Sequence, residues 1–185
     1  MPRLPRALYV AAAFAFAAPT LAADPPAPQT TMQTLLDRIQ IEDLIVSYYS
    51  NLGGNGKGFS DYYTDDAVFD LCGKIYKGKA GIEQSYKDLG ATNPLPKGTF
   101  HMLLTNPQIN VTGDKAVATF IWTGVINEQI KAPPRFVEQG REYDLLAKKN
   151  GQWRITKRAV IADSGLPDFC DATWKARKDY DPLKD

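Results

Sequence analysis

The 185-residue chain predicts an α+β domain in which N-terminal helices wrap one face of a curved antiparallel sheet. Apolar residues recur every three or four positions in the first part of the domain, which is typical of helices that pack on one side. The later part has segments of strand composition, and Asn150-Gly151, the strongest hairpin signal in the chain, joins the last two of them. Helices followed by long antiparallel strands favour this architecture, with room for a pocket between sheet and helices.

The chain starts with a segment typical of a secretory signal peptide. Arg3 and Arg6 precede the apolar run 7–18, and small residues follow that run. We therefore expect cleavage of residues 1–23 and export of the protein, which would be periplasmic or secreted. The run is shorter than a membrane-spanning helix, which disfavours the alternative of a membrane anchor. The proline-rich residues 24–31 are expected to form an extended lead-in.

The remaining 162 residues have the size of one domain and carry 20 basic against 21 acidic side chains. This balance disfavours nucleic acid or an anionic membrane as the natural partner. Cys72 and Cys170 are predicted to form a disulfide, because export places them in an oxidising compartment. The close spacing of Cys and His that metal sites favour is missing, so no metal site is predicted.

Periodicity and turn residues place the elements within a domain over residues 32–162, followed by a polar tail over 163–185. A threonine at position 30 or 31 is expected to cap the first helix. The apolar stripe of that helix permits a break into two helices at Gln40. The expected helices are 32–52, 59–64 and 80–89, and the expected strands are 67–72, 74–76, 99–111 with a disturbance at Pro107, 116–128, 141–148 and 153–161.

Six short motifs in a fixed order resemble the SnoaL-like group of the nuclear transport factor 2-like superfamily, over about residues 32–162. After a helix that carries tyrosines they are Tyr63-Thr64-Asp65-Asp66-Ala67-Val68-Phe69-Asp70, Gly78-Lys79-Ala80-Gly81-Ile82, Thr99-Phe100-His101, Gly113-Asp114-Lys115-Ala116-Val117-Ala118, Gly140-Arg141-Glu142-Tyr143-Asp144 and Gly151-Gln152-Trp153-Arg154-Ile155. The resemblance implies a cone-shaped α+β barrel around one deep apolar pocket. It also implies a homodimer or homotrimer and an activity without metal or organic cofactor.

The group includes scytalone dehydratase, bile-acid dehydratases, ketosteroid isomerases and lignin-dimer formaldehyde lyases. The same fold also hosts binding and assembly proteins, so the fold alone does not determine an activity. The leading hypothesis is a cofactor-independent lyase that eliminates water or a small carbonyl fragment from a hydroxylated aromatic or polycyclic substrate. The alternatives are a proton-shuttling isomerase of the same fold and a non-catalytic exported domain that binds a small hydrophobic hydroxylated molecule.

His101, the only histidine in the chain, is the leading candidate for acid–base catalysis. It is similar to the catalytic histidine of the dehydratases on the corresponding strand, and histidine titrates near neutral pH. Its alternative is a core histidine. Tyr48 matches the helix tyrosine that lines the pocket in the group, where it would hydrogen-bond a leaving hydroxyl or a developing oxyanion. Gly53 stands where the group often carries an aspartate, which departs from the pattern.

Strand alternation adds further candidates if His101 faces the pocket. Trp122 and Glu128 are then expected to face it from the next strand, and Arg141 and Tyr143 from the strand after that. Tyr143 would act with Tyr48 as a hydrogen-bond donor in catalysis. The other three residues would bind substrate, with the arginine holding an anionic or phenolic oxygen.

Each of these residues also has a purely structural interpretation. Tyr143 would then be a core tyrosine, Glu128 a surface charge, and Arg141 the partner of Glu128 or Glu142 in an ion pair. Arg158 is a further possible pocket cation, and its alternative is a solvated position beside a lysine.

Overall fold

The computed structural model describes residues 31–52, 58–92, 97–165 and 170–185. The expected signal peptide lies outside these residues, as do most of the expected lead-in and Gly53. Among the described residues, no helix is both long enough and apolar enough to cross a membrane.

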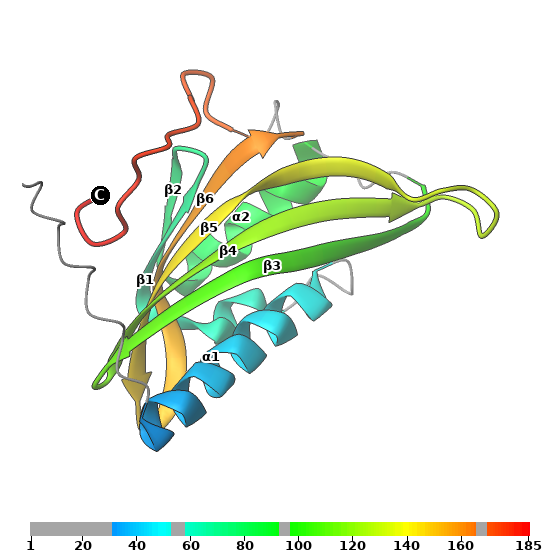
Figure 1. Cartoon of the computed structure of the whole chain (residues 1–185). Coiled ribbons are helices and arrows are strands. Elements are labelled where there is room, and N and C mark those ends of the chain that lie inside the picture. Colours follow the sequence, from blue (N-terminus) through cyan, green and yellow to red (C-terminus); the bar gives the residue numbers. More distant parts are fainter. Residues whose placement is uncertain (1–30, 53–57, 93–96, 166–169) are drawn as a thin grey trace, which may run out of the picture.

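Two α-helices and one six-stranded sheet make up the domain. The elements are α1 (Met32–Asn51), the 3₁₀-helix η1 (Phe59–Tyr62), β1 (Tyr63–Leu71), β2 (Lys74–Lys77), α2 (Gly78–Thr92), β3 (Thr99–Thr112), β4 (Lys115–Asn127), β5 (Arg135–Lys149) and β6 (Gln152–Ser164). The strands lie in the order β2-β1-β6-β5-β4-β3. They spread from a narrow end as they curve, and α1 crosses one side of them (Figure 1). This arrangement confirms the predicted α+β cone.

The sheet is mixed, so the expectation of a purely antiparallel sheet is wrong at one pair of strands. β1 runs parallel to β6, whereas the other neighbouring strands are antiparallel. β1 and β6 come from the first and last parts of the sheet-forming sequence, so no short turn connects them and no local sequence signal indicates that they pair. β1 and β5 also begin four and six residues earlier than expected. Asp65-Asp66 and Gly140 interrupt the strand composition there without ending the strands.

α1 is one continuous helix because its cap and its packing agree along its length. The hydroxyl of Thr31 accepts a hydrogen bond from the Thr34 amide, and the Thr31 amide donates to the Thr34 hydroxyl in return. The expected cap at Thr31 is therefore confirmed. Ile45 and Tyr48 continue the buried stripe beyond Gln40, so the permitted break does not occur.

A buried carboxylate fastens α1 to the β5–β6 hairpin. Asp37 is 3% exposed and lies 2.6 Å from the Lys148 ammonium. The indole N–H of Trp153 donates to the same carboxylate at 3.1 Å. Burial acts to raise the pKa of Asp37, but its hydrogen bonds, that with Lys148 foremost, leave the pKa below its ordinary value. The contact fixes the position of the hairpin under the helix.

A bulge divides β3 into two segments. The pairing with β4 shifts by one residue between Thr105 and Gln108. Asn106, inside this shift, has a left-handed backbone with a φ of 52°. The disturbance expected at Pro107 is thus confirmed.

A second bulge, in β6, determines which of its side chains face the helices. Lys157 pairs with Leu145, whereas Ile155 pairs with the next residue of β5, which leaves Thr156 as an extra residue. The hydroxyl of Thr156 donates to the Leu145 carbonyl at 3.0 Å and holds the bulge in place. As a result, Ile155 and Arg158, three positions apart, both point to the inside of the cone.

The described C-terminal residues 170–185 pack on the outer side of the sheet, and in Figure 1 this red segment runs beside β2. The ring of Tyr180 lies 4.9 Å from that of Tyr143. Cys72 and Cys170 are free thiols, and burial raises the pKa of both. Their disulfide stays a prediction.

Candidate functional site

Three charged side chains inside the cone form what we call the interior charge cluster. Glu142, Asp144 and Arg158 are all 0% exposed. Arg158 donates from Nε and Nη2 to the two carboxylate oxygens of Asp144, at 2.8 Å each. Its Nη2 also lies 3.0 Å from Glu142 Oε1. A buried charge is costly unless it is paired, so each of the three depends on the other two.

Four tyrosines enclose the interior charge cluster. The guanidinium of Arg158 lies 4.0 Å from the ring centroid of Tyr48 and 5.6 Å from that of Tyr63. The hydroxyl of Tyr49 donates to Glu142 Oε2. The four are Tyr48 and Tyr49 of α1, Tyr63 of β1 and Tyr86 of α2, and the hydroxyls of Tyr48 and Tyr86 hydrogen-bond to each other.

The pKa values of Glu142 and Arg158 are both raised, for different reasons. Burial raises the pKa of Glu142 to about 8; Arg158 opposes this rise and Asp144 adds to it. Burial acts against the charge of Arg158, but Asp144 and Glu142 hold its pKa well above the ordinary value. Near neutral pH Glu142 is therefore largely a carboxylic acid beside the Arg158 cation, and this acid is able to exchange a proton.

Several buried polar atoms inside the cone have no hydrogen-bond partner among the described residues. They include the indole N–H of Trp122, the Tyr63 hydroxyl, Arg158 Nη1 and Glu142 Oε1, which faces Arg158 without hydrogen-bond geometry. Native folds leave few such atoms, so several together single out this part of the interior. Gly140 lets the indole pack directly on the backbone of β5, since a Cβ there would lie 2.4 Å from the Trp122 ring.

The expectation that His101 faces the interior is wrong. The side chain of His101 is exposed, as is that of Leu103, whereas the intervening Met102 packs against the core with Leu104. The alternate positions Phe100, Met102 and Leu104 are all large and apolar, whereas the set that contains His101 has only Leu103. The alternation therefore favoured an outward His101, and its inward placement depended on the resemblance to the dehydratases.

The same one-residue error applies to the first strand of the last hairpin. Arg141 lies on the outer face and binds Asp163 through two hydrogen bonds of 3.0 and 2.8 Å. Tyr143, also outside, packs against the C-terminal segment. Glu128 is exposed and pairs with Arg135 at 2.7 Å. None of the three expected residues reaches the interior charge cluster. For Arg141 and Tyr143 the reason is that the alternate residues of β5 face inward instead, and Glu128 lies beyond the end of β4.

Tyr48 and Trp122 do lie inside the cone, where the sequence placed them, and so does Arg158. The sequence interpretation missed Glu142 and Asp144. One feature of the sequence could have revealed them: they occupy alternate positions of one strand, opposite an arginine of the next strand. In the described part of the chain, no group of three or more His, Cys, Asp or Glu side chains is arranged to hold a metal ion.

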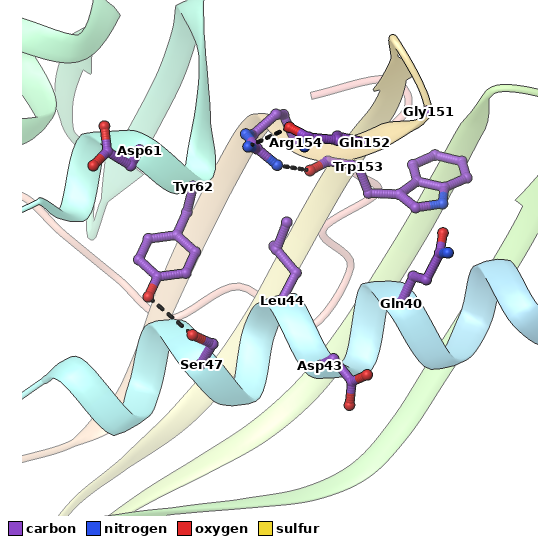
Figure 2. Close-up of a pocket in the computed structure, with 10 residues that line it drawn as sticks. All are labelled: Gln40, Asp43, Leu44, Ser47, Asp61, Tyr62, Gly151, Gln152, Trp153 and Arg154. Carbon is purple, nitrogen blue, oxygen red and sulfur yellow. Dashed lines mark hydrogen bonds between the residues drawn. The ribbon is translucent and has the colours of Figure 1, made fainter.

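A groove of about 510 Å³ lies outside the cone, between α1, η1 and the tip of the β5–β6 hairpin. Figure 2 shows some of its polar side chains engaged with one another: the hydroxyls of Tyr62 and Ser47 are 3.1 Å apart, and Arg154 donates to the Trp153 carbonyl at 2.7 Å. The Trp153 indole N–H donates to Asp37. The buried, unpartnered groups are inside the cone, so we take the interior charge cluster as the candidate site.

The cone, with helices on one face of a curved sheet, defines a nuclear transport factor 2-like domain. A family model for the SnoaL-like domain matches residues 33–159. The chain therefore belongs to the SnoaL-like family, and the resemblance seen in the sequence is confirmed.

Solved structures share this fold at low sequence identity. A protein of unknown function from Mycobacterium tuberculosis has a TM-score of 0.60 at 21% identity, over 74% of this chain and 77% of that one. A proposed aromatic ring hydroxylase from Novosphingobium aromaticivorans has a TM-score of 0.59 at 24% identity, over 74% and 98%. A proposed scytalone dehydratase from the same bacterium has a TM-score of 0.58 at 16% identity, over 71% and 87%. These likenesses establish the fold alone. No curated protein matches the chain.

Proposed function

We propose that the protein is a cofactor-independent lyase that removes water or a small carbonyl fragment from a small, hydrophobic, hydroxylated molecule. Glu142 is the acid–base group in this proposal. The supporting observation is a carboxyl group that is completely buried, accepts a hydrogen bond from Tyr49, lies beside Arg158 and has a pKa of about 8. A buried carboxylate with that pKa is a stronger base than an ordinary glutamate, and its acid form is present at neutral pH.

In loss of water, ionised Glu142 takes a proton from the carbon next to the hydroxyl-bearing carbon. The electrons of the broken C–H bond form the double bond as the C–O bond breaks. The carboxylic acid then gives its proton to the departing hydroxyl, which leaves as water, and Glu142 is ionised again. In loss of a carbonyl fragment, Glu142 instead takes the hydroxyl proton, a C–C bond breaks as the carbonyl forms, and the proton goes to the remaining carbon.

Negative charge on an oxygen of the substrate would be stabilised by the unpartnered donors. Arg158 Nη1, the Trp122 indole and the Tyr63 hydroxyl provide N–H and O–H groups that the fold does not use. If the proton returned to another carbon instead of the hydroxyl, the same groups would support an isomerase. If Glu142 exchanged no proton with the ligand, the interior would only bind it.

The test is absorbance spectroscopy with a panel of hydroxylated aromatic ketones, because elimination creates conjugation. The wild type should change the absorbance of at least one member, and Glu142→Gln should lose about 10²–10⁴-fold in rate. His101→Ala is the matched control and should keep the wild-type rate, since His101 is exposed on the outer face. Full turnover by Glu142→Gln would refute the mechanism. Ligand-induced thermal stabilisation without any absorbance change would favour the binding domain.

A further inference from the structure

The side of α1 that faces away from the sheet carries a second apolar stripe. Ile41, Ile45 and Tyr48 are buried against the sheet. An α-helix turns once in about 3.6 residues, so positions three, four or seven apart lie on one side. On the side opposite the buried residues are five large apolar side chains, between 40% and 75% exposed, which we call the outer α1 stripe: Met32, Leu35, Leu36, Ile39 and Val46.

No described element covers the outer α1 stripe. α1 packs against β3, β6 and η1, and Figure 1 shows it along the margin of the molecule, with the sheet on one side only. From Met32 to Val46 the stripe extends about 21 Å along the helix axis. Single exposed apolar side chains are ordinary on a protein surface, but a continuous stripe of this length is typical of a helix that packs on both sides.

The residues of the chain that precede α1 do not suit the stripe. Residues 24–30 are Asp-Pro-Pro-Ala-Pro-Gln-Thr and contain no large apolar side chain. They therefore have little apolar surface to bury against leucine and isoleucine side chains. The stripe requires a partner with an apolar surface of similar length, and a second copy of α1 supplies one.

The charges beside the stripe favour a second copy in antiparallel orientation. Arg38 and Glu42 lie one turn apart on the same flank, and neither has a hydrogen bond or an ion pair with a described residue. If two antiparallel helices meet at Ile39, position 42 of one lies at the level of position 36 of the other. Arg38 of that copy is two residues away, about 3 Å along the axis. Each arginine then lies beside the glutamate of the other copy, which gives two equivalent ion pairs across a two-fold axis.

The two ends of α1 are complementary in the same arrangement. The first turn of α1 contains no acidic residue, so the positive end of its helix dipole is not compensated there. Glu42 and Asp43 lie toward the other end of the stripe. An antiparallel pair places the amino-terminal half of each helix beside the acidic residues of the other copy. A parallel pair would instead bring the acidic residues of both copies together.

We propose that two copies of the chain associate through the outer α1 stripe, with antiparallel helices around a two-fold axis near Ile39. The inference is independent of the proposed lyase activity, because the stripe and the interior charge cluster lie on opposite sides of α1. Asp43 is the one charged residue inside the stripe, so its charge weakens the dimer, and Asp43→Leu should tighten it.

The test is sedimentation velocity of the mature chain from about 1 μM to about 1 mM, the range in which weak dimers dissociate. The wild type should pass from monomer to dimer as its concentration rises. Ile39→Glu, which puts two carboxylates at the axis, should stay monomeric throughout. Leu103→Glu is the matched control on the outer face of the sheet, since Leu103 is 47% exposed and Ile39 48%. It should dimerise as the wild type does, and circular dichroism should show both variants folded.

Exchange of the flanking charges tests the antiparallel orientation. Glu42→Arg places two positive charges together at both ends of the interface and should weaken the dimer about tenfold or more. Arg38→Glu should weaken it to a similar degree by placing two negative charges together. The double variant has both ion pairs in reversed order and should recover the dissociation constant of the wild type.

A wild type that stays monomeric at every concentration, or that forms a trimer, would overturn the inference. So would a dimer that survives Ile39→Glu, or one that is lost in folded Leu103→Glu, which would place the interface on the sheet. A double charge variant that dimerises no better than the two single variants would overturn it as well. Turnover by the wild type and Glu142→Gln tests the lyase separately and has no bearing on these outcomes.

Discussion

The buried carboxyl of Glu142 should make the protein less stable as the pH rises. Its pKa is about 8 in the folded chain, against 4.5 for an ordinary glutamate. Between these two values the unfolded chain has released the proton and the native chain still holds it. Unfolding is then favoured by about 1.4 kcal/mol for each unit of pH. From pH 5 to pH 8 this single group should remove about 3 kcal/mol of the free energy of unfolding.

Glu142→Gln removes the titrating group while it keeps the shape of the side chain. Urea unfolding of the wild type and the variant at pH 5, 6.5 and 8 measures the effect, because the difference between them cancels the other titrating groups. The variant should gain stability relative to the wild type at each step, by about 3 kcal/mol in all. Glu128→Gln, on the surface, should run parallel to the wild type. Parallel profiles for Glu142→Gln and the wild type would show that Glu142 is ionised in the native interior.

Three further outcomes are expected. Asp37→Ala should lower the free energy of unfolding by about 2–4 kcal/mol in urea titrations, because it leaves the buried Trp153 indole and the Lys148 ammonium unpaired; an unchanged midpoint would contradict this role. In exported protein, intact-mass analysis without reductant should show two hydrogens fewer and no alkylation at the contacting Cys72 and Cys170, whereas two alkylated thiols would refute the disulfide. Amino-terminal sequencing of protein from the cell envelope should find a chain that starts after Ala22 or Ala23, and a chain that starts at Met1 would disprove export with cleavage.

Local signals account for the parts of the fold that the sequence predicts correctly. The threonine cap, the apolar stripe of α1 and the Asn150-Gly151 turn each act over a few residues, and so they can be recognised in the sequence. The pairing of β1 with β6 joins residues about 90 positions apart, for example Phe69 with Arg158. No local pattern describes such a pair, and the parallel direction was missed for that reason.

The candidate site was harder to predict because it depends on which face each strand turns inward. Phe100, Met102 and Leu104 form the more apolar set around His101, but the resemblance to the dehydratases led to the opposite orientation. Strict alternation from Trp153 through β6 would turn Arg158 outward, and only the extra residue at Thr156 turns it inward. Asp and Glu are almost never fully buried unless they are paired, so the sequence alone gives no reason to place Glu142 and Asp144 inside the cone. Their burial is understandable only once Arg158 is known to lie opposite them.

The bulge at Thr156 implies that β6 carries one residue more than its pairing with β5 uses. Ile155 pairs with Leu146 and Lys157 with Leu145, so deletion of Thr156 would leave both pairs in place as neighbours in a regular ladder. Arg158 would still point toward the tyrosines, and Lys157 would still point to the outside. Where related sequences are aligned, a gap at this one position therefore does not mark the loss of the interior charge cluster.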